Sequence, residues 1–226
     1  MEIGIIGSGN IGSTLAEYLT NLEHEVMIAN SRGPESLSEV VEKTGARAVT
    51  AEEAAGAKDL VIIAIPNKAM VNLPIGILST SKAIIVDAGN YYPSRDGKIA
   101  EIEEGLTDSE WVSKVIGHSV IKAFNMITAP SLASKAIPAG SPNRIALSVA
   151  GNEEEQKQVI MKLINTIGFD TIDGGLLSDS WRQQPGEPAY CQDLDKDSLK
   201  AALQQADISK RAENLAQADE MARPYL

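Results

Sequence analysis

The sequence is poor in several residue types, and each scarcity narrows what the chain can be. Cys191 is the only cysteine among the 226 residues, which excludes an internal disulfide framework and a cysteine-based zinc site. Aromatic residues make up only 4% of the chain, so the core must consist of Ile, Val, Leu and Ala, as in a parallel sheet buried on both faces. We expect no metal site, and we expect the Cys191 thiol to have no function.

Positive charge and long apolar runs are scarce as well. The formal net charge is −11 and the sequence has no basic cluster, which argues against nucleic acid and anionic membranes as partners. No segment approaches the ~20 apolar residues of a membrane span. The apolar opening Ile3–Ile6 is too short for the core of a signal peptide. We therefore expect a cytoplasmic protein.

Short apolar runs alternate with helical patterns along the chain. Strands are expected at Glu2–Ile6, Glu25–Ala29, Leu60–Ile65, Ala83–Asp87, Val120–Phe124, Ile145–Val149 and Phe169–Ile172, and helices at Gly12–Leu22, Leu37–Lys43, Glu52–Ala57 and Glu153–Thr166. Pro- and Gly-rich loops are expected at Tyr91–Gly97 and Ile137–Asn143. The alternation predicts an α/β fold, a doubly wound and mostly parallel Rossmann sheet with right-handed crossovers.

A glycine-rich segment joins the first strand to the first helix. It fits the pattern G-x-G-x-x-G with Gly7, Ser8, Gly9, Asn10, Ile11 and Gly12. Gly7 permits a tight turn, Gly9 lets a pyrophosphate approach the backbone, and Gly12 lets the helix pack closely on the sheet. The helix N-terminus adds free N–H groups and a partial positive charge. The segment therefore predicts a dinucleotide site.

The end of the second strand predicts which dinucleotide binds. An NAD site normally has Asp or Glu there, to accept hydrogen bonds from the ribose 2′-hydroxyl. This chain has Asn30, Ser31, Arg32 and Gly33 instead, so no carboxylate repels a 2′-phosphate. Ser31 can donate a hydrogen bond and Arg32 can bind the phosphate with its planar guanidinium. The sequence therefore predicts NADP, with a solvated surface arginine as the alternative for Arg32.

With these segments placed, the chain resembles the NADP-dependent deazaflavin (coenzyme F420) oxidoreductases over residues 1 to about 175. The resemblance extends to Ile65-Pro66, to Asp87-Ala88-Gly89-Asn90 and to Asn152. The segment Lys122–Asn125 is similar to one in the cytosolic domain of the six-transmembrane epithelial antigen metalloreductases. The resemblance implies an oxidoreductase in which NADPH exchanges hydride with a flavin-like coenzyme.

Several segments that follow strands are expected to meet at the carboxyl edge of the sheet, where ligands of such folds bind. We expect Pro66, after Ile65, to hold its loop against the nicotinamide ribose, with a simple turn as the alternative. Asn90 and Asn125 can bond to the carboxamide or ribose, or can serve as turn and capping residues. No general acid is identified, because His118 precedes a strand and is expected to have a structural role.

The chain changes character near Gly175. We expect an NADP-binding Rossmann domain at residues 1–175 and a helical C-terminal segment at 176–226, which serves as a cap or as a dimerisation element. Trp181 can stack on an aromatic acceptor and Arg182 can bind an anionic group on it, but a domain or dimer contact is equally consistent with the sequence. A homodimer is one of the two arrangements that the tail allows.

The sequence favours an NADPH-dependent oxidoreductase that transfers hydride between NADP(H) and a deazaflavin, a flavin-like compound or another small organic acceptor. One alternative is a non-catalytic NADP-binding module with a regulatory or redox-sensing role. A second is reduction of an imine or carbonyl, as in the pyrroline-carboxylate reductases. The short tail argues against this one, because those enzymes carry a substantial helical domain after the Rossmann part.

Overall fold

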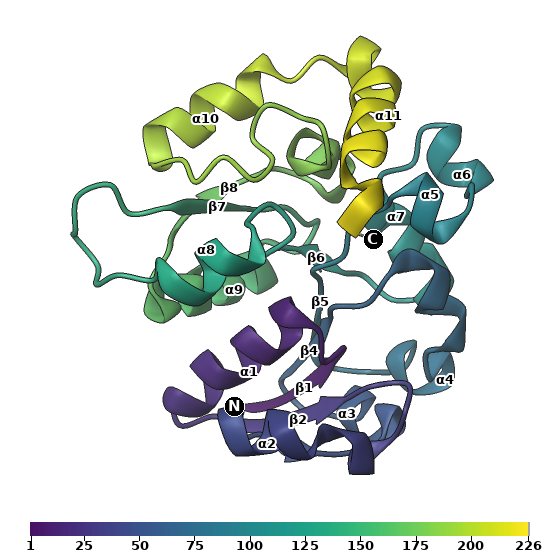
Figure 1. The fold of residues 1–226 in the computed structure, drawn as a ribbon, viewed down its shortest axis with the longest axis vertical. Helices are drawn as coiled ribbons and strands as arrows, with labels where there is room; N and C mark the ends of the chain where they lie inside the picture. Colours follow the sequence, from purple (N-terminus) through teal and green to yellow (C-terminus); the bar gives the residue numbers. More distant parts are fainter. Residues whose placement is uncertain (226) are drawn as a thin grey trace.

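A computed structural model describes residues 1–225 and contains one six-stranded parallel sheet (Figure 1). Its strands are β1 (Glu2–Ile6), β2 (Glu25–Ala29), β3 (Arg47–Ala48), β4 (Leu60–Ile63), β5 (Ile84–Asp87) and β6 (Ile121–Lys122). They lie in the order β3-β2-β1-β4-β5-β6, which is the Rossmann order. The predicted fold class is therefore confirmed, and the order of the strands reverses between β1 and β4.

Helices cover both faces of this sheet (Figure 1). They are α1 (Asn10–Asn21), α2 (Ser38–Thr44), α3 (Ala51–Ala55), α4 (Ile75–Leu78), α5 (Pro93–Asp96), α6 (Ala100–Glu103), α7 (Asp108–Ile116), α8 (Ala129–Ser134), α9 (Glu154–Ile167), α10 (Lys196–Gln205) and α11 (Arg211–Ala222), with 3-10 turns η1 (Pro34–Leu37), η2 (Asn67–Asn72), η3 (Leu177–Gln183), η4 (Ile208–Lys210) and η5 (Arg223–Tyr225). None of the helices in residues 1–225 has the length and apolar character needed to cross a membrane.

Side chains of successive strand residues enter two different apolar clusters. Ile3 and Ile5 of β1 pack in one cluster with α1, α8 and α9, whereas Ile6 packs in the other with α3, α4 and α7. β4 alternates in the same way, because Ile62 belongs to the first cluster and Ile63 to the second. The central strands are buried on both faces, which explains why they are nearly continuous apolar runs.

The last two strands leave the main sheet. β7 (Ala146–Val149) and β8 (Asp170–Asp173) pair in parallel with each other, and a single antiparallel bridge between Lys122 and Ala150 joins them to β6. The sequence predicts both strands but not their separation. Phe124, just past β6, has a φ of 64°, which ends the extended conformation and turns the chain away from the six-stranded sheet.

The C-terminal tail folds back over the second sheet and the carboxyl edge of the first (Figure 1). Helix α10 packs on β7 and β8, and α11 packs on α5. The expected helical character of the tail is present in α10 and α11, whereas the boundary at residue 175 stays a prediction. The expectation of a loop at Tyr91–Gly97 is wrong, because Pro93 begins the short helix α5 there and Gly97 ends it with a φ of 76°.

A buried ion pair ties β5 to β6 at their carboxyl ends. The Lys122 ammonium donates to Asp87 at 3.0 Å and to the Gly89 carbonyl at 2.7 Å. The two side chains are 0% and 1% exposed. Asp87 also accepts hydrogen bonds from the Ser109 hydroxyl at 2.6 Å and from the Gly89 amide at 2.9 Å. This network fixes the backbone that leads from β5 into the loop at residues 88–92.

Replacing Lys122 by Ala would leave the Asp87 carboxylate buried without its cation. We expect the free energy of unfolding to fall by about 3–5 kcal/mol, measured by urea denaturation. The matched control is Lys114→Ala, which breaks an exposed pair with Glu101 and should leave the urea midpoint nearly unchanged. Equal midpoints for the two variants would show that the buried pair does not hold β5 to β6.

Candidate functional site

The turn from β1 into α1 is packed tightly at two glycines and open at a third. Gly7 has a φ of 122°, and a side chain there would meet the Ala64 carbonyl. A side chain at Gly12 would meet the carbonyl of Gly7, so this glycine allows α1 to lie close to the strand. A Cβ on Gly9, in contrast, would have no heavy atom within 4 Å. The turn therefore leaves free space where a pyrophosphate would approach the backbone.

The N-terminus of α1 faces this space without a cap from the protein. Gly9 occupies the N-cap position, no side chain accepts the first amides, and the first turn contains no acidic residue. The N–H groups of Asn10, Ile11 and Gly12 therefore belong to a 12-residue helix whose positive end is available to an anion.

A pocket of about 440 Å³ lies at the carboxyl ends of β1, β2 and β4. Its wall includes most of the residues that the sequence predicts for cofactor binding: Gly7, Ser8, Gly9, Asn30, Ser31, Arg32, Ile65 and Pro66. We call it the cofactor pocket. Segments that are far apart in the sequence thus meet at the switch point of the sheet, where such folds bind dinucleotides.

Asn30 organises the part of this pocket predicted to read the 2′-phosphate. Its amide donates to the hydroxyls of Ser8 at 3.2 Å and Ser36 at 2.9 Å, and its carbonyl accepts the Arg32 amide at 2.9 Å. Ser31 and Arg32 are exposed beside it, and Arg32 has no carboxylate partner within residues 1–225. The turn therefore presents a hydroxyl and a free guanidinium at the pocket mouth.

Asn90 and Asn125 lie together beyond the ends of β5 and β6. The Asn90 amide donates to the Asn125 carbonyl at 2.9 Å, and the Asn125 amide donates to the Asn90 side-chain oxygen at 3.0 Å. Asn125 is buried, and Gln183 of η3 supplies both a carbonyl acceptor at 2.8 Å and an amide donor at 2.9 Å to its side chain. Asn125 therefore positions Asn90, while a direct bond from Asn125 to the cofactor stays a prediction.

A pair of tyrosines beside Asn90 was not predicted from the sequence. The hydroxyls of Tyr92 and Tyr190 are 2.8 Å apart, and the Asn90 amide donates to the Tyr190 hydroxyl at 3.2 Å. Burial raises the pKa of both tyrosines, so both remain neutral phenols at neutral pH. Both also line a second pocket, of about 600 Å³, formed by the 186–192 segment and α11. We call it the tail pocket.

Asn67 was also missed as a site residue. It follows Pro66, it is 1% exposed, and neither its amide nitrogen nor its oxygen has a hydrogen-bond partner within residues 1–225. Its oxygen is oriented toward Gly89, where a Cβ would be 3.5 Å away. Buried amides are nearly always satisfied, so the two unpaired polar atoms of Asn67 are unusual.

Comparison with known proteins identifies the family. The family model for coenzyme F420-dependent NADP oxidoreductases matches residues 2–91. The crystal structure of the hypothetical protein SMa0349 from Sinorhizobium meliloti is 35% identical and covers 87% of this chain and 97% of its own, with a TM-score of 0.73. The chain belongs to the F420-dependent NADP oxidoreductase family. NADP is its cofactor, as the sequence predicts.

Two further relatives of this oxidoreductase family member differ in extent. The Escherichia coli protein YjhV is 39% identical over 80 residues, which are 35% of this chain and 56% of YjhV, so the match spans about half of that curated relative. A candidate F420-dependent NADP reductase from Arthrobacter sp. FB24 is 22% identical, covers 80% of this chain and 87% of its own, and has a TM-score of 0.66. At this identity the likeness shows the fold alone.

The structure of this family member gives Trp181 and Arg182 local partners. Trp181 is 9% exposed, and the Arg182 guanidinium lies over its ring, 5.2 Å from the centroid. Arg182 also pairs with Asp179 at 3.0 Å and lines a separate hollow together with Lys200. A contact of either side chain with an acceptor stays a prediction, and so does the alternative of a domain or dimer contact.

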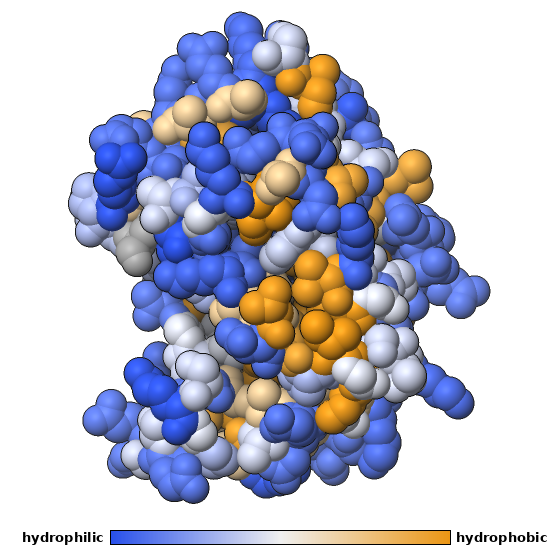
Figure 2. Space-filling model, turned by 90° about the vertical axis from the view of Figure 1, so that its right-hand side faces the viewer, coloured by the Kyte–Doolittle hydropathy of each residue, from blue (hydrophilic) through white to orange (hydrophobic). Residues whose placement is uncertain are grey.

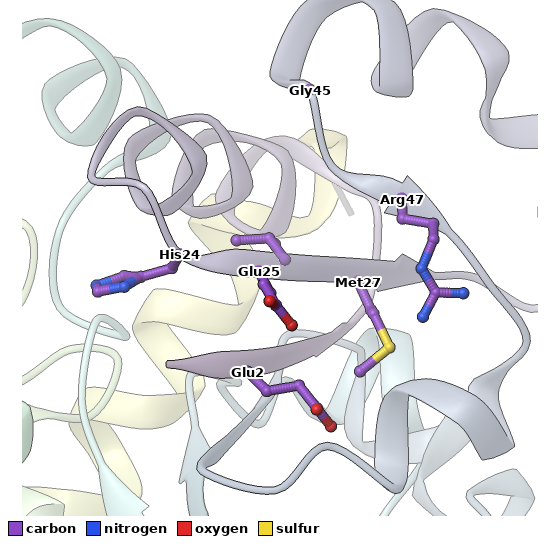
Figure 3. Close-up of a pocket in the computed structure, with 7 residues that line it drawn as sticks. Glu2, His24, Glu25, Met27, Gly45 and Arg47 are labelled. Carbon is purple, nitrogen blue, oxygen red and sulfur yellow. The ribbon is translucent and has the colours of Figure 1, made fainter.

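The two histidines lie away from the cofactor pocket. The His118 ring contacts the carbonyls of Ser119 at 2.7 Å and Ser81 at 3.2 Å, at the amino end of β6, in agreement with the predicted structural role. His24 borders a hollow of about 400 Å³ that Figure 3 shows between the amino ends of β1 and β2, with Arg47 of β3 at its side. This hollow is at the opposite edge of the sheet from the α1 N-terminus.

Arg32→Ala tests recognition of the 2′-phosphate. The variant loses a charge-assisted bond that NADH cannot form, so NADPH affinity should fall by about 1.5–3 kcal/mol while NADH affinity changes little. Isothermal titration with both cofactors measures the difference. The matched control is Arg47→Ala at the far hollow, which should change neither affinity. Equal losses for NADPH and NADH in Arg32→Ala would show that Arg32 does not read the phosphate.

Gly9→Val tests the phosphate loop itself. The valine side chain would fill the open space at the centre of the turn, so both cofactors should fail to bind while the fold persists. A thermal-shift titration with NADPH measures this, since a ligand that binds only the folded state raises its Tm. A variant that keeps the full NADPH-induced shift would place the pyrophosphate elsewhere.

Proposed function

We propose that the chain is an NADPH-dependent reductase that transfers hydride to a small organic acceptor bound in the tail pocket. The observation that carries this proposal is the hydrogen bond from Asn90, at the end of β5, to Tyr190 in the wall of the tail pocket. A dinucleotide whose pyrophosphate binds at Gly9 extends across the switch point toward the ends of β5 and β6. The Asn90–Tyr190 contact thus lies where the two ligands would meet.

The residues present fit an NADP molecule at several points. The open space at Gly9 and the uncapped helix α1 suit the pyrophosphate, and Ser31 with Arg32 suits the 2′-phosphate. Asn67 and Asn90 carry amides at the end where the nicotinamide half would lie. When bound, NADPH supplies a hydride.

The protein's own part is to position the two ligands and exclude water. Lys122 and Asp87 fix the backbone below Asn90, and Asn125 fixes its side chain, so the amide of Asn90 is held in one orientation. The tail helix α11 supplies one side of the tail pocket. Holding two rings in a fixed, water-poor arrangement is the main requirement for hydride transfer between them.

The acceptor on this proposal is a flavin-like compound or another small organic molecule. Purified protein should oxidise NADPH faster than NADH when it is offered riboflavin, a deazaflavin or a quinone, as measured by loss of reduced-nicotinamide absorbance. NADPH that binds tightly yet is oxidised no faster with any of these acceptors would contradict the proposal and favour the regulatory, redox-sensing alternative.

Asn90→Ala tests the junction between the two ligands. The variant loses an oriented amide at the reacting end, and we expect kcat/KM with a working acceptor to fall by an amount equivalent to about 1–3 kcal/mol. The matched control is Asn21→Ala on the exposed end of α1, which should keep full activity. Unchanged kcat/KM in Asn90→Ala would move the reacting centre away from β5.

A further inference from the structure

The tail pocket has a distinctive set of polar groups. Hydroxyls come from Tyr92, Tyr190 and Thr128, and amides from Asn214 and Gln217 of α11. These groups are uncharged. The Thr128 hydroxyl donates to Ser131 at 3.0 Å, whereas the amides of Asn214 and Gln217 each keep a second N–H that can donate to a neutral oxygen or nitrogen atom of a ligand. Their chemistry differs from that of the cofactor pocket, where a guanidinium and a helix N-terminus face the ligand.

The carboxyl of Glu187 also lies in the wall of the tail pocket. Glu187 is 3% exposed and accepts a hydrogen bond from the Asn214 amide at 3.3 Å through one oxygen. Its other oxygen, Oε2, is buried without a partner in residues 1–225. Burial raises the pKa of this carboxyl, because the charged form is poorly solvated there. An anionic group of a ligand nearby would raise the free energy of the charged carboxylate further.

Two arginines near the tail pocket, Arg95 and Arg211, make other contacts within the protein. Arg95 lies over the Tyr92 ring, 5.4 Å from its centroid, and pairs with Asp96 at 2.9 Å. Arg211 donates to the carbonyls of Gly105 at 2.9 Å and Leu106 at 2.6 Å, which docks the start of α11 on the 105–106 turn. These two guanidinium groups therefore stabilise contacts within the protein around the tail pocket.

The hydroxyl of Tyr190 can point into the pocket. Its oxygen accepts from the Asn90 amide, and when Tyr92 donates to it as well, both acceptor positions of that oxygen are filled. The hydrogen of Tyr190 then points toward the Cys191 thiol, a weak acceptor that an oxygen or nitrogen atom of a ligand can replace. The apolar part of the wall comes from Ala218, Met221 and Ala222 of α11, which suits a flat, weakly polar molecule.

We propose, building on the proposed reductase function, that the tail pocket selects an uncharged acceptor whose oxygen or nitrogen accepts a hydrogen bond from Tyr190. Anionic acceptors are disfavoured because they would lie beside the Glu187 carboxyl, and the lining described within residues 1–225 contains no Lys or Arg to pair with them. The lining therefore does not fit the phosphate and carboxylate groups of coenzyme F420. This member of the family prefers a neutral ring or carbonyl compound over that anionic coenzyme.

Riboflavin and FMN are matched probes for this preference, because they share one ring system and only FMN carries a phosphate. Binding to the full-length protein saturated with NADP⁺ is measured by quenching of flavin fluorescence. We expect riboflavin to bind at least about tenfold more tightly than FMN, because the FMN phosphate would lie beside the Glu187 carboxyl without a positively charged partner. FMN that binds as tightly as riboflavin, or riboflavin that shows no saturable binding, would overturn the proposal.

Two variants test which residues cause the preference for an uncharged ligand. Tyr190→Phe should weaken riboflavin about five- to tenfold, the loss of one hydrogen bond, whereas Tyr18→Phe, which removes a hydroxyl bonded to the Leu132 carbonyl, should not. Glu187→Gln should strengthen FMN several-fold and leave riboflavin unchanged. Riboflavin binding that is indifferent to Tyr190→Phe, or an unchanged FMN affinity in Glu187→Gln, would overturn the assignment.

Turnover separates this inference from the proposed function. Faster NADPH oxidation with FMN or with the F420 deazaflavin than with riboflavin would leave the reductase function standing and refute the preference for neutral acceptors. Selective binding of riboflavin without oxidation of NADPH by any acceptor would support the preference and refute the reductase function.

Discussion

The buried ion pair between Lys122 and Asp87 is the contact on which the geometry of the site depends. It joins the ends of β5 and β6 and also holds the Gly89 backbone, so the loop that carries Asn90 and Tyr92 has one fixed path. Removing one partner of a buried charge pair is strongly destabilising, because the other charge is left buried and unpaired. The pair contacts Gly89, which precedes Asn90 in the chain, where we expect the nicotinamide to bind.

The same carboxyl edge of the sheet carries two pockets of opposite chemistry. The cofactor pocket offers backbone N–H groups and Arg32 to an anion, whereas the tail pocket offers hydroxyls, amides and the Glu187 carboxyl. Helix α11 forms much of the second pocket, and Figure 2 shows apolar side chains gathered at mid-height on the face of the molecule that carries α4, α5 and α11 in Figure 1. Met221 of α11 and Val71 of η2 are 78% and 65% exposed.

Local sequence signals predicted the first pocket and could not predict the second. The spacing from Gly7 to Gly12 and the aliphatic strands are properties of neighbouring residues, and the structure has the predicted fold with these residues at the switch point. Tyr190 reaches Asn90 only because the tail folds back across 100 residues of sequence. No repeating pattern of residues in the sequence indicates that the tail folds back in this way. The positive φ of Phe124, which separates β7 and β8 from the main sheet, likewise has no signal in the residue type.

The most direct test is a crystal structure of the protein with NADP⁺. We expect the pyrophosphate at Gly9, the 2′-phosphate at Ser31 and Arg32, and the nicotinamide within hydrogen-bond distance of Asn90 or Asn67, facing the tail pocket. A cofactor bound at the α1 N-terminus whose nicotinamide points away from β5, or one bound at another edge of the sheet, would contradict this expectation.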